Sequence, residues 1–152
     1  MFGFGKPTRE KVASHTEHHD WSKKDLSGLD LSGLTFHHCQ FVGTNFDGAN
    51  LSNAQISHCN LQGANLRGAN LSGMQLHHCD LKRAVLAGAN LARAQIRHSQ
   101  LPGAQVQGAI VDGASFGFCD LEGTGIQGVT RGRASYDNCE GIEEGAGLEG
   151  GD

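Results

Sequence analysis

The chain has 152 residues, of which 38% are hydrophobic and 18% are charged, with a formal net charge of −4. This length predicts one domain. No stretch is long and apolar enough to cross a membrane, and the opening MFGFGKPTREK lacks the apolar core of a secretory signal. We therefore expect a cytoplasmic protein that makes no contact with a membrane. Secretion without a cleavable signal stays open.

Residues 1–25 precede the regular part of the chain and are expected to form an N-terminal arm or cap. A polar run with three histidines leads from Pro7 to Trp21. An open solenoid end exposes backbone groups and core side chains, which terminal caps normally cover. We expect this arm to fold over the first coil, with Trp21 as a lid residue.

From residue 26 the sequence repeats every five residues. An apolar residue stands at every fifth position from Leu26 to Ile126, and a small residue, most often Ala, stands two positions before it. An α-helix would scatter this pattern around its surface, and a flat strand would switch it between faces. Gly or Asn follows most of the apolar positions by two residues, as a type II turn requires. The pattern predicts a four-sided coil with five residues per side.

A second period of twenty residues lies over the first, so four pentads make one coil and residues 26–139 make about five. We interpret the cysteines as reduced thiols at the small inward position. Parallel side chains in a ladder do not offer the dihedral angle of a disulfide, and a line of thiolates does not surround a metal ion. The period is marked by five cysteines, with Ser99 in the gap: Cys39, Cys59, Cys79, Cys119 and Cys139.

The motif A(N/Q/D)LxG, which covers residues 26 to about 130, resembles that of the pentapeptide repeat proteins. This resemblance implies an all-β fold, a right-handed quadrilateral β-helix solenoid. Members of that family include inhibitors and protectors of bacterial type II topoisomerase that mimic duplex DNA, and some bacterial effectors.

The sequence offers no chemistry for catalysis. A filled interior and flat faces leave no concave site, and no Ser/His/Asp or paired-carboxylate arrangement stands out. We expect a protein that is not an enzyme and needs no cofactor. We favour a protein-binding scaffold whose partner the sequence does not name.

A DNA mimic would need a dense acidic surface, and the charges of this chain do not provide one. Residues 26–135 contain six acidic and seven basic side chains, and the acidity gathers in the glycine-rich tail, 140–152, which we expect to be disordered. Modulation of DNA gyrase, by inhibition or by quinolone protection, is therefore the alternative. Direct nucleic-acid binding is not expected, because the basic side chains do not line up in one row along the rod. An end-to-end homodimer stays open, although the chain lacks the terminal helix through which topoisomerase inhibitors of the family often dimerise.

Histidines recur at one corner beside the cysteines, and we expect them to stack about 4.8 Å apart. Histidine tolerates the left-handed backbone conformation, which explains why it can stand where other corners have glycine; the other explanation is that this edge uses a different turn. A linear ladder brings at most two imidazoles to one ion, so weak metal binding at His38, His58, His78 and His98 is a second alternative. Charging two neighbours would cost about 0.9 kcal/mol in water, so protonation should be anticooperative. The candidate interaction residues are His37, His38, His58, His77, His78, Arg97, His98 and Phe118.

Overall fold

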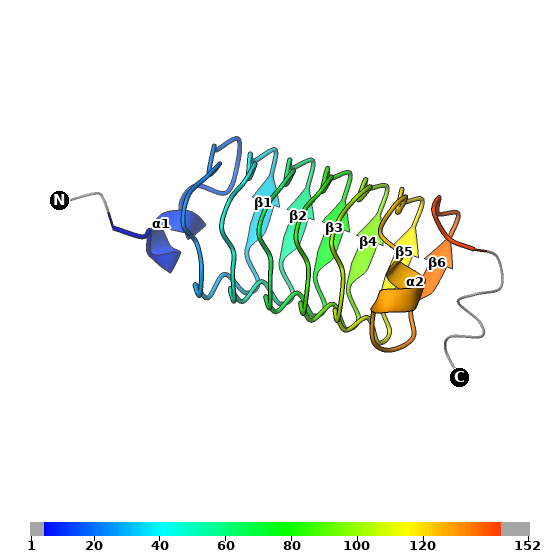
Figure 1. Ribbon diagram of the computed structural model, residues 1–152. Coiled ribbons are helices and arrows are strands. Elements are labelled where there is room, and N and C mark those ends of the chain that lie inside the picture. Colours follow the sequence, from blue (N-terminus) through cyan, green and yellow to red (C-terminus); the bar gives the residue numbers. More distant parts are fainter. Residues whose placement is uncertain (1–4, 144–152) are drawn as a thin grey trace.

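The computed structural model describes residues 5–143, whose coils stack into a rod (Figure 1). One parallel sheet runs along it in the order β1-β2-β3-β4-β5-β6. Paired positions are twenty residues apart, as where Phe36 pairs with Ile56. The predicted solenoid of about five coils is confirmed. Its elements are α1 (Arg9–Ala13), β1 (Thr35–His37), β2 (Gln55–Ser57), β3 (Gln75–His77), β4 (Gln95–Arg97), β5 (Ser115–Gly117), α2 (Ile126–Val129) and β6 (Ser135–Asp137).

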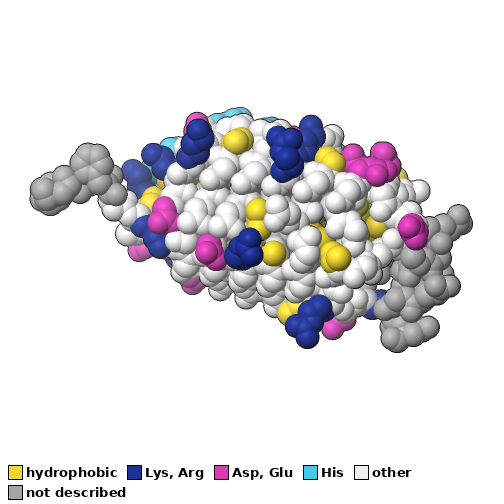
Figure 2. All heavy atoms as spheres, viewed as in Figure 1, with side chains coloured by type: hydrophobic (Ala, Val, Ile, Leu, Met, Phe, Trp, Pro, Cys, Tyr) yellow, Lys and Arg dark blue, Asp and Glu magenta, His cyan; other side chains and the backbone are white. Residues whose placement is uncertain are grey.

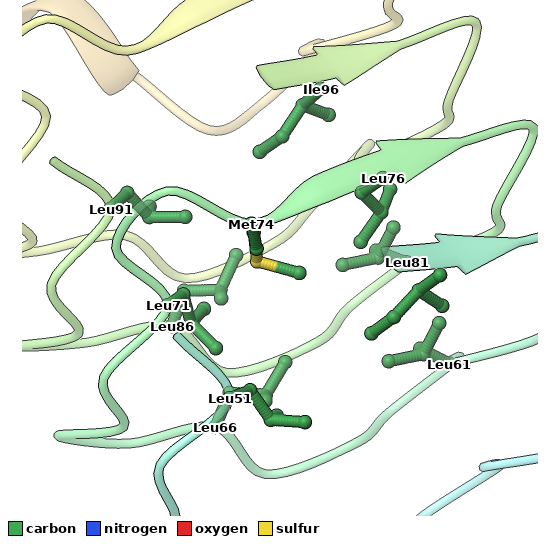
Figure 3. A pocket seen from close by; sticks show the side chains of 11 residues that line it. Leu51, Leu61, Leu66, Leu71, Met74, Leu76, Leu81, Leu86, Leu91 and Ile96 are labelled. Atoms are coloured by element: carbon green, nitrogen blue, oxygen red, sulfur yellow. The ribbon is translucent and has the colours of Figure 1, made fainter. Parts of the chain in front are cut away.

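The other three sides of each coil pair through single parallel bridges, such as Asn45 with Asn65, Asn50 with Asn70 and Asn60 with Asp80. Four ladders therefore run along the rod, one on each side. The inward residues of the motif are buried: Leu66 is 2% exposed and Ala64 is 0% exposed. Figure 3 shows apolar side chains from successive coils pointing into the same interior. They line a small apolar cavity, and the rest of the interior is occupied by buried side chains.

Three corners of each regular coil are type II turns. At the corner of Phe46, the N–H of Ala49 donates to the carbonyl of Phe46 at 2.9 Å. The third residue of that turn, Gly48, has φ +66°, whereas the second has no positive φ. Asn53 takes the same left-handed conformation at the next corner, with φ 59°. The turn type predicted from the glycine positions is therefore present at these corners.

The fourth corner, which follows each strand, is built differently. His58 has φ 55°, so histidine occupies the left-handed position that glycine takes elsewhere. The N–H of Cys39 donates to Sγ of Cys59 at 3.3 Å, and the N–H of Cys79 donates to Oγ of Ser99 at 3.1 Å. Inward side chains thus hold this corner to the next coil. Both explanations offered by the sequence apply here, the left-handed histidine and the different turn.

The cysteine side chains lie in the core beneath this corner. Cys39, Cys59, Cys79 and Cys119 are buried free thiols, and Cys139 is half-buried. Burial raises the pKa of the Cys119 thiol to about 11. A thiol of that kind stays protonated near neutral pH and packs as a small apolar side chain.

Helix α1 covers the N-terminal end of the rod. Its Val12 is fully buried, and the indole N–H of nearby Trp21 donates to the carbonyl of His15 at 3.0 Å. Arg9 donates to the carbonyl of Asp30 at 2.7 Å, which fastens the helix to the coil below. Parallel bridges already join residues 17 and 20 to the next coil, so the ladder reaches into the segment assigned to the arm.

The last coil departs from the repeat. Helix α2 occupies part of one side, and Ile110 pairs with Arg131, twenty-one residues on. Arg131 stands where an apolar residue was due and is exposed. The register returns at Tyr136, which pairs with Phe116. Half-buried Ile142 packs against this end, and the predicted tail beyond residue 143 lies outside the described residues.

Neither described helix has the length and apolar composition that a membrane crossing requires.

Candidate interaction surface

One edge of the rod carries a continuous stack of rings, which we call the imidazole edge. Neighbouring ring centroids are 4.9 to 5.0 Å apart and the planes are at most 10° from parallel. Histidine side chains are visible along the upper edge of the rod in Figure 2. The sequence predicted four members, and the structure adds a fifth imidazole and a phenyl ring. The edge consists of His18, His38, His58, His78, His98 and Phe118.

The backbone creates this stack. Each ring belongs to a residue in the left-handed conformation, from His18 with φ 52° to Phe118 with φ 54°. Identical corners repeat once per coil, so their side chains leave in the same direction at the spacing of parallel strands. Because all six side chains are exposed, the stack presents one ring edge per coil to solvent.

A second column lies beside the imidazole edge, on the strands themselves. It places His77 of β3 next to Arg97 of β4 and Gly117 of β5. A Cβ built on Gly117 would lie 3.0 Å from Nη1 of Arg97. The guanidinium therefore extends over a glycine of the next coil, in space that a larger residue would fill. In the same column, Nδ1 of His37 forms a hydrogen bond with Oγ of Ser57.

The pKa of His77 reflects the charges in this column. Burial lowers its pKa from the ordinary value of 6.5, and the neighbouring charges of His78, Arg97 and His98 lower it further. The positive charges around His77 make its own protonation less favourable. This part of the surface is electropositive.

The side of the rod that carries strands β1 to β5 is free of carboxylates over those five coils. We call it the basic face: it consists of residues 33–38, 53–58, 73–78, 93–98 and 113–118. These segments contain no Asp or Glu, but they contain Arg93, Arg97 and six of the nine histidines. Arg93 also lies over a glycine, because its Cγ is 3.4 Å from a Cβ built on Gly113. The nearly equal numbers of acidic and basic side chains hold for the rod as a whole, but they do not reveal that the carboxylates are absent from the basic face.

The carboxylates lie on other sides of the rod or in the end coils of the strand side, where Glu17 bridges to His37 and Asp137 ends β6 beside Gly117. Asp80 and Asp120 stand two residues beyond the imidazole edge, where Lys82 pairs with Asp80 at 3.8 Å. Figure 2 shows charges of both signs scattered over the side in view. The basic face thus differs from the rest of the rod in sign, and the imidazole edge forms its border.

Comparison with known proteins identifies the chain's relatives. A family model described as a pentapeptide repeat region matches residues 17–91. The chain belongs to the pentapeptide repeat family. No curated protein sequence matches it.

Solved structures of other pentapeptide repeat proteins share its fold. One is a trypsin-treated variant of QnrB1, a plasmid-mediated fluoroquinolone resistance protein, which is 26% identical with a TM-score of 0.63. That match covers 90% of this chain and 78% of the other. A pentapeptide repeat protein from the cyanobacterium Cyanothece 51142 is 22% identical with a TM-score of 0.57, and the match covers 66% of this chain and 78% of the other. The latter likeness shows the fold alone.

The imidazole edge of this pentapeptide repeat protein gives a metal ion few ligands. Among residues 5–143, no group of three or more His, Cys, Asp or Glu side chains is placed to hold one ion. Parallel rings in a line offer two nitrogens at best. Of the predicted candidates, His38, His58, His78 and His98 share the edge with Phe118, while His37, His77 and Arg97 share the neighbouring column. His18 was missed as a member of the edge, although its position twenty residues before His38 could have revealed it.

Proposed function

We propose that this pentapeptide repeat protein is a non-catalytic, cytoplasmic protein-binding scaffold that engages its partner through the imidazole edge and the basic face. The observation that carries the proposal is the exposed stack of five imidazoles capped by Phe118, which is 52% exposed. The buried residues of the rod explain its stability, whereas the exposed rings of this stack are not part of the core. Exposed aromatic and arginine side chains are the types that dominate protein interfaces.

Rigidity supports the same proposal. Each ring is held by a fixed corner of the coil and by the rings above and below it, as His78 is held between His58 and His98. Arg97 rests on the backbone of the next coil. Side chains that are already ordered lose little conformational entropy on binding. A rigid row of this kind can contact a partner at several coils at once.

The experiment uses the purified protein as bait with a matched pair of variants. The double variant H58G/H78G removes two central rings at positions whose backbone suits glycine. The control, Arg67→Gln, changes an exposed side chain on another side of the rod. We expect a partner that the wild type and the control retain and that the double variant loses. A partner retained equally by all three proteins would place the interface elsewhere and overturn the proposal.

Modulation of DNA gyrase is the second candidate. The likeness to QnrB1, at 26% identity over 90% of this chain, favours it. The charge distribution opposes it, because a duplex-DNA mimic needs a dense acidic surface, whereas residues 26–135 carry six acidic and seven basic side chains. Inhibition of gyrase supercoiling distinguishes the two candidates.

A further inference from the structure

We propose that the occupant of the basic face is an acidic peptide segment of the partner. This inference rests on the proposed scaffold function and specifies the chemistry of its partner. The supporting observation is charge segregation: five consecutive coils present Arg93, Arg97 and six histidines on one side of the rod without a carboxylate.

The arginines provide the permanent charge of this surface. Arg97 ends β4, and Arg93 lies at the left-handed corner two residues before that strand, with φ 61°. Their side chains lie across Gly113 and Gly117 of the next coil, which leaves both guanidinium groups at the surface of the sheet. A planar guanidinium binds carboxylates through two parallel hydrogen bonds. Two such groups on one coil can hold two acidic side chains.

The histidines supply hydrogen-bond donors beside the arginines, because six imidazoles lie on this face and a ring N–H can donate to a carboxylate. Carboxylates of the chain surround the face: Asp80 and Asp120 lie beyond the imidazole edge, and Glu17 and Asp137 stand next to His37 and Gly117 in the end coils. Lys82 pairs with Asp80 at 3.8 Å. The middle coils, which carry both arginines, are therefore where an acidic segment is expected.

The dimensions fit a short extended peptide. The rings from His38 to His98 step along the rod at 4.9 to 5.0 Å each. This run spans about 15 Å, which an extended chain crosses in about five residues. Exposed Gln55, Gln75 and Gln95 lie in one row beside it and can pair with peptide groups. A nucleic acid fits less well, because its binding depends mainly on cations that neutralise phosphates, and this face has two permanent cations.

The test measures binding of a fluorescent octaglutamate peptide to the full chain by anisotropy, at low salt. At pH 8, Arg97→Gln should weaken binding about fivefold, whereas Arg67→Gln should leave it unchanged, although both remove one positive charge. An octalysine peptide and a single-stranded octanucleotide complete the set, and circular dichroism verifies that both variants fold.

The possible contrary results each overturn the acidic-segment proposal. They are octalysine binding as tightly as octaglutamate, Arg67→Gln weakening binding as much as Arg97→Gln, or preference for the octanucleotide. Self-association of the free protein that Arg97→Gln abolishes would make a second copy the occupant. The octaglutamate test can fail while the H58G/H78G bait still loses a partner. That combination would refute the acidic chemistry and leave the scaffold function supported.

Discussion

The phenyl ring of Phe118 lies on the imidazole of His98, with centroids 4.9 Å apart and planes 4° apart. This spacing equals that between two imidazoles of the same edge, as between His78 and His98. A phenyl ring has no polar atom, so ring chemistry does not set the distance. The repeated left-handed corner does, and it would stack other planar side chains placed there in the same way.

Substitution by Asp should have very different effects on stability at Leu66, which points into the core, and at Asn70, which points outward. Leu66→Asp places a carboxylate at a position that is 2% exposed, and it should lower the free energy of unfolding by at least about 4 kcal/mol. Asn70→Asp should cost little, because Oδ1 of Asn70 accepts a hydrogen bond from the N–H of Ser72, which a carboxylate can also accept. Thermal melts followed by circular dichroism measure both. Equal melting temperatures would contradict the inward and outward assignment.

The imidazole edge predicts an unusual tolerance for glycine. His58 has φ 55°, so His58→Gly relieves left-handed strain while it loses contact with two rings, and stability should change by less than about 1 kcal/mol. His58→Val should cost about 1–3 kcal/mol, because a β-branched residue fits this conformation poorly. Chemical denaturation of the two variants tests this. A less stable glycine variant would mean that ring stacking holds the corner.

Metal binding to the edge should be weak. Zinc or nickel can reach two ring nitrogens at a time, and water must supply the remaining ligands. Calorimetric titration should show no sub-micromolar site, and His58→Gly should change the weak signal only slightly. A sub-micromolar site lost in that variant would make the imidazole edge a metal centre.

His77 should titrate below its ordinary value. Burial lowers its pKa, with smaller contributions from His78, Arg97 and His98, so the neutral form is favoured in the folded protein. Stability from this residue is therefore complete above pH 6.5 and is lost as the pH falls through the lower folded value. An NMR titration of the His77 ring should give a midpoint below 6.5, and Arg97→Gln should raise it. A midpoint above 6.5 would exclude the burial described for this side chain.

Gyrase should be little affected. The rod is nearly neutral as a whole, and its one-signed face is basic, whereas a DNA mimic must be acidic. Supercoiling assays with purified gyrase should show little inhibition at concentrations where acidic members of the family would act. Potent inhibition would favour the topoisomerase function over the scaffold.

The regular part of the fold could be predicted because one local rule repeats. An apolar residue every fifth position and a left-handed residue two places later suffice to define the coil, and Leu66 and Asn53 lie where that rule puts them. Helix α2 could not be predicted, because the pentad rule still holds at Ile126 and the extra residue follows it. The position of Arg97 over Gly117 depends on two residues twenty apart.

The candidate surface was predicted in part. Counting by twenty finds the column of His38, His58, His78 and His98, but His18 was assigned to the arm because the apolar repeat begins later. The basic face was missed because charges were counted over the whole rod and by column. Arg93 and Arg97 belong to different columns, and only the four-sided coil shows that both lie on one side.

The placement of long side chains over glycines has a consequence for how such a chain can change its length. Removal of residues 94–113 would keep every pentad and the apolar stack intact. It would also set Arg133 beside Arg93 in place of Gly113, bringing two guanidinium groups onto one corner about 4.8 Å apart. The coils are therefore not interchangeable units that recombination could duplicate or delete freely. The side chains at the corners of each coil are matched to the residues of the coil that follows it.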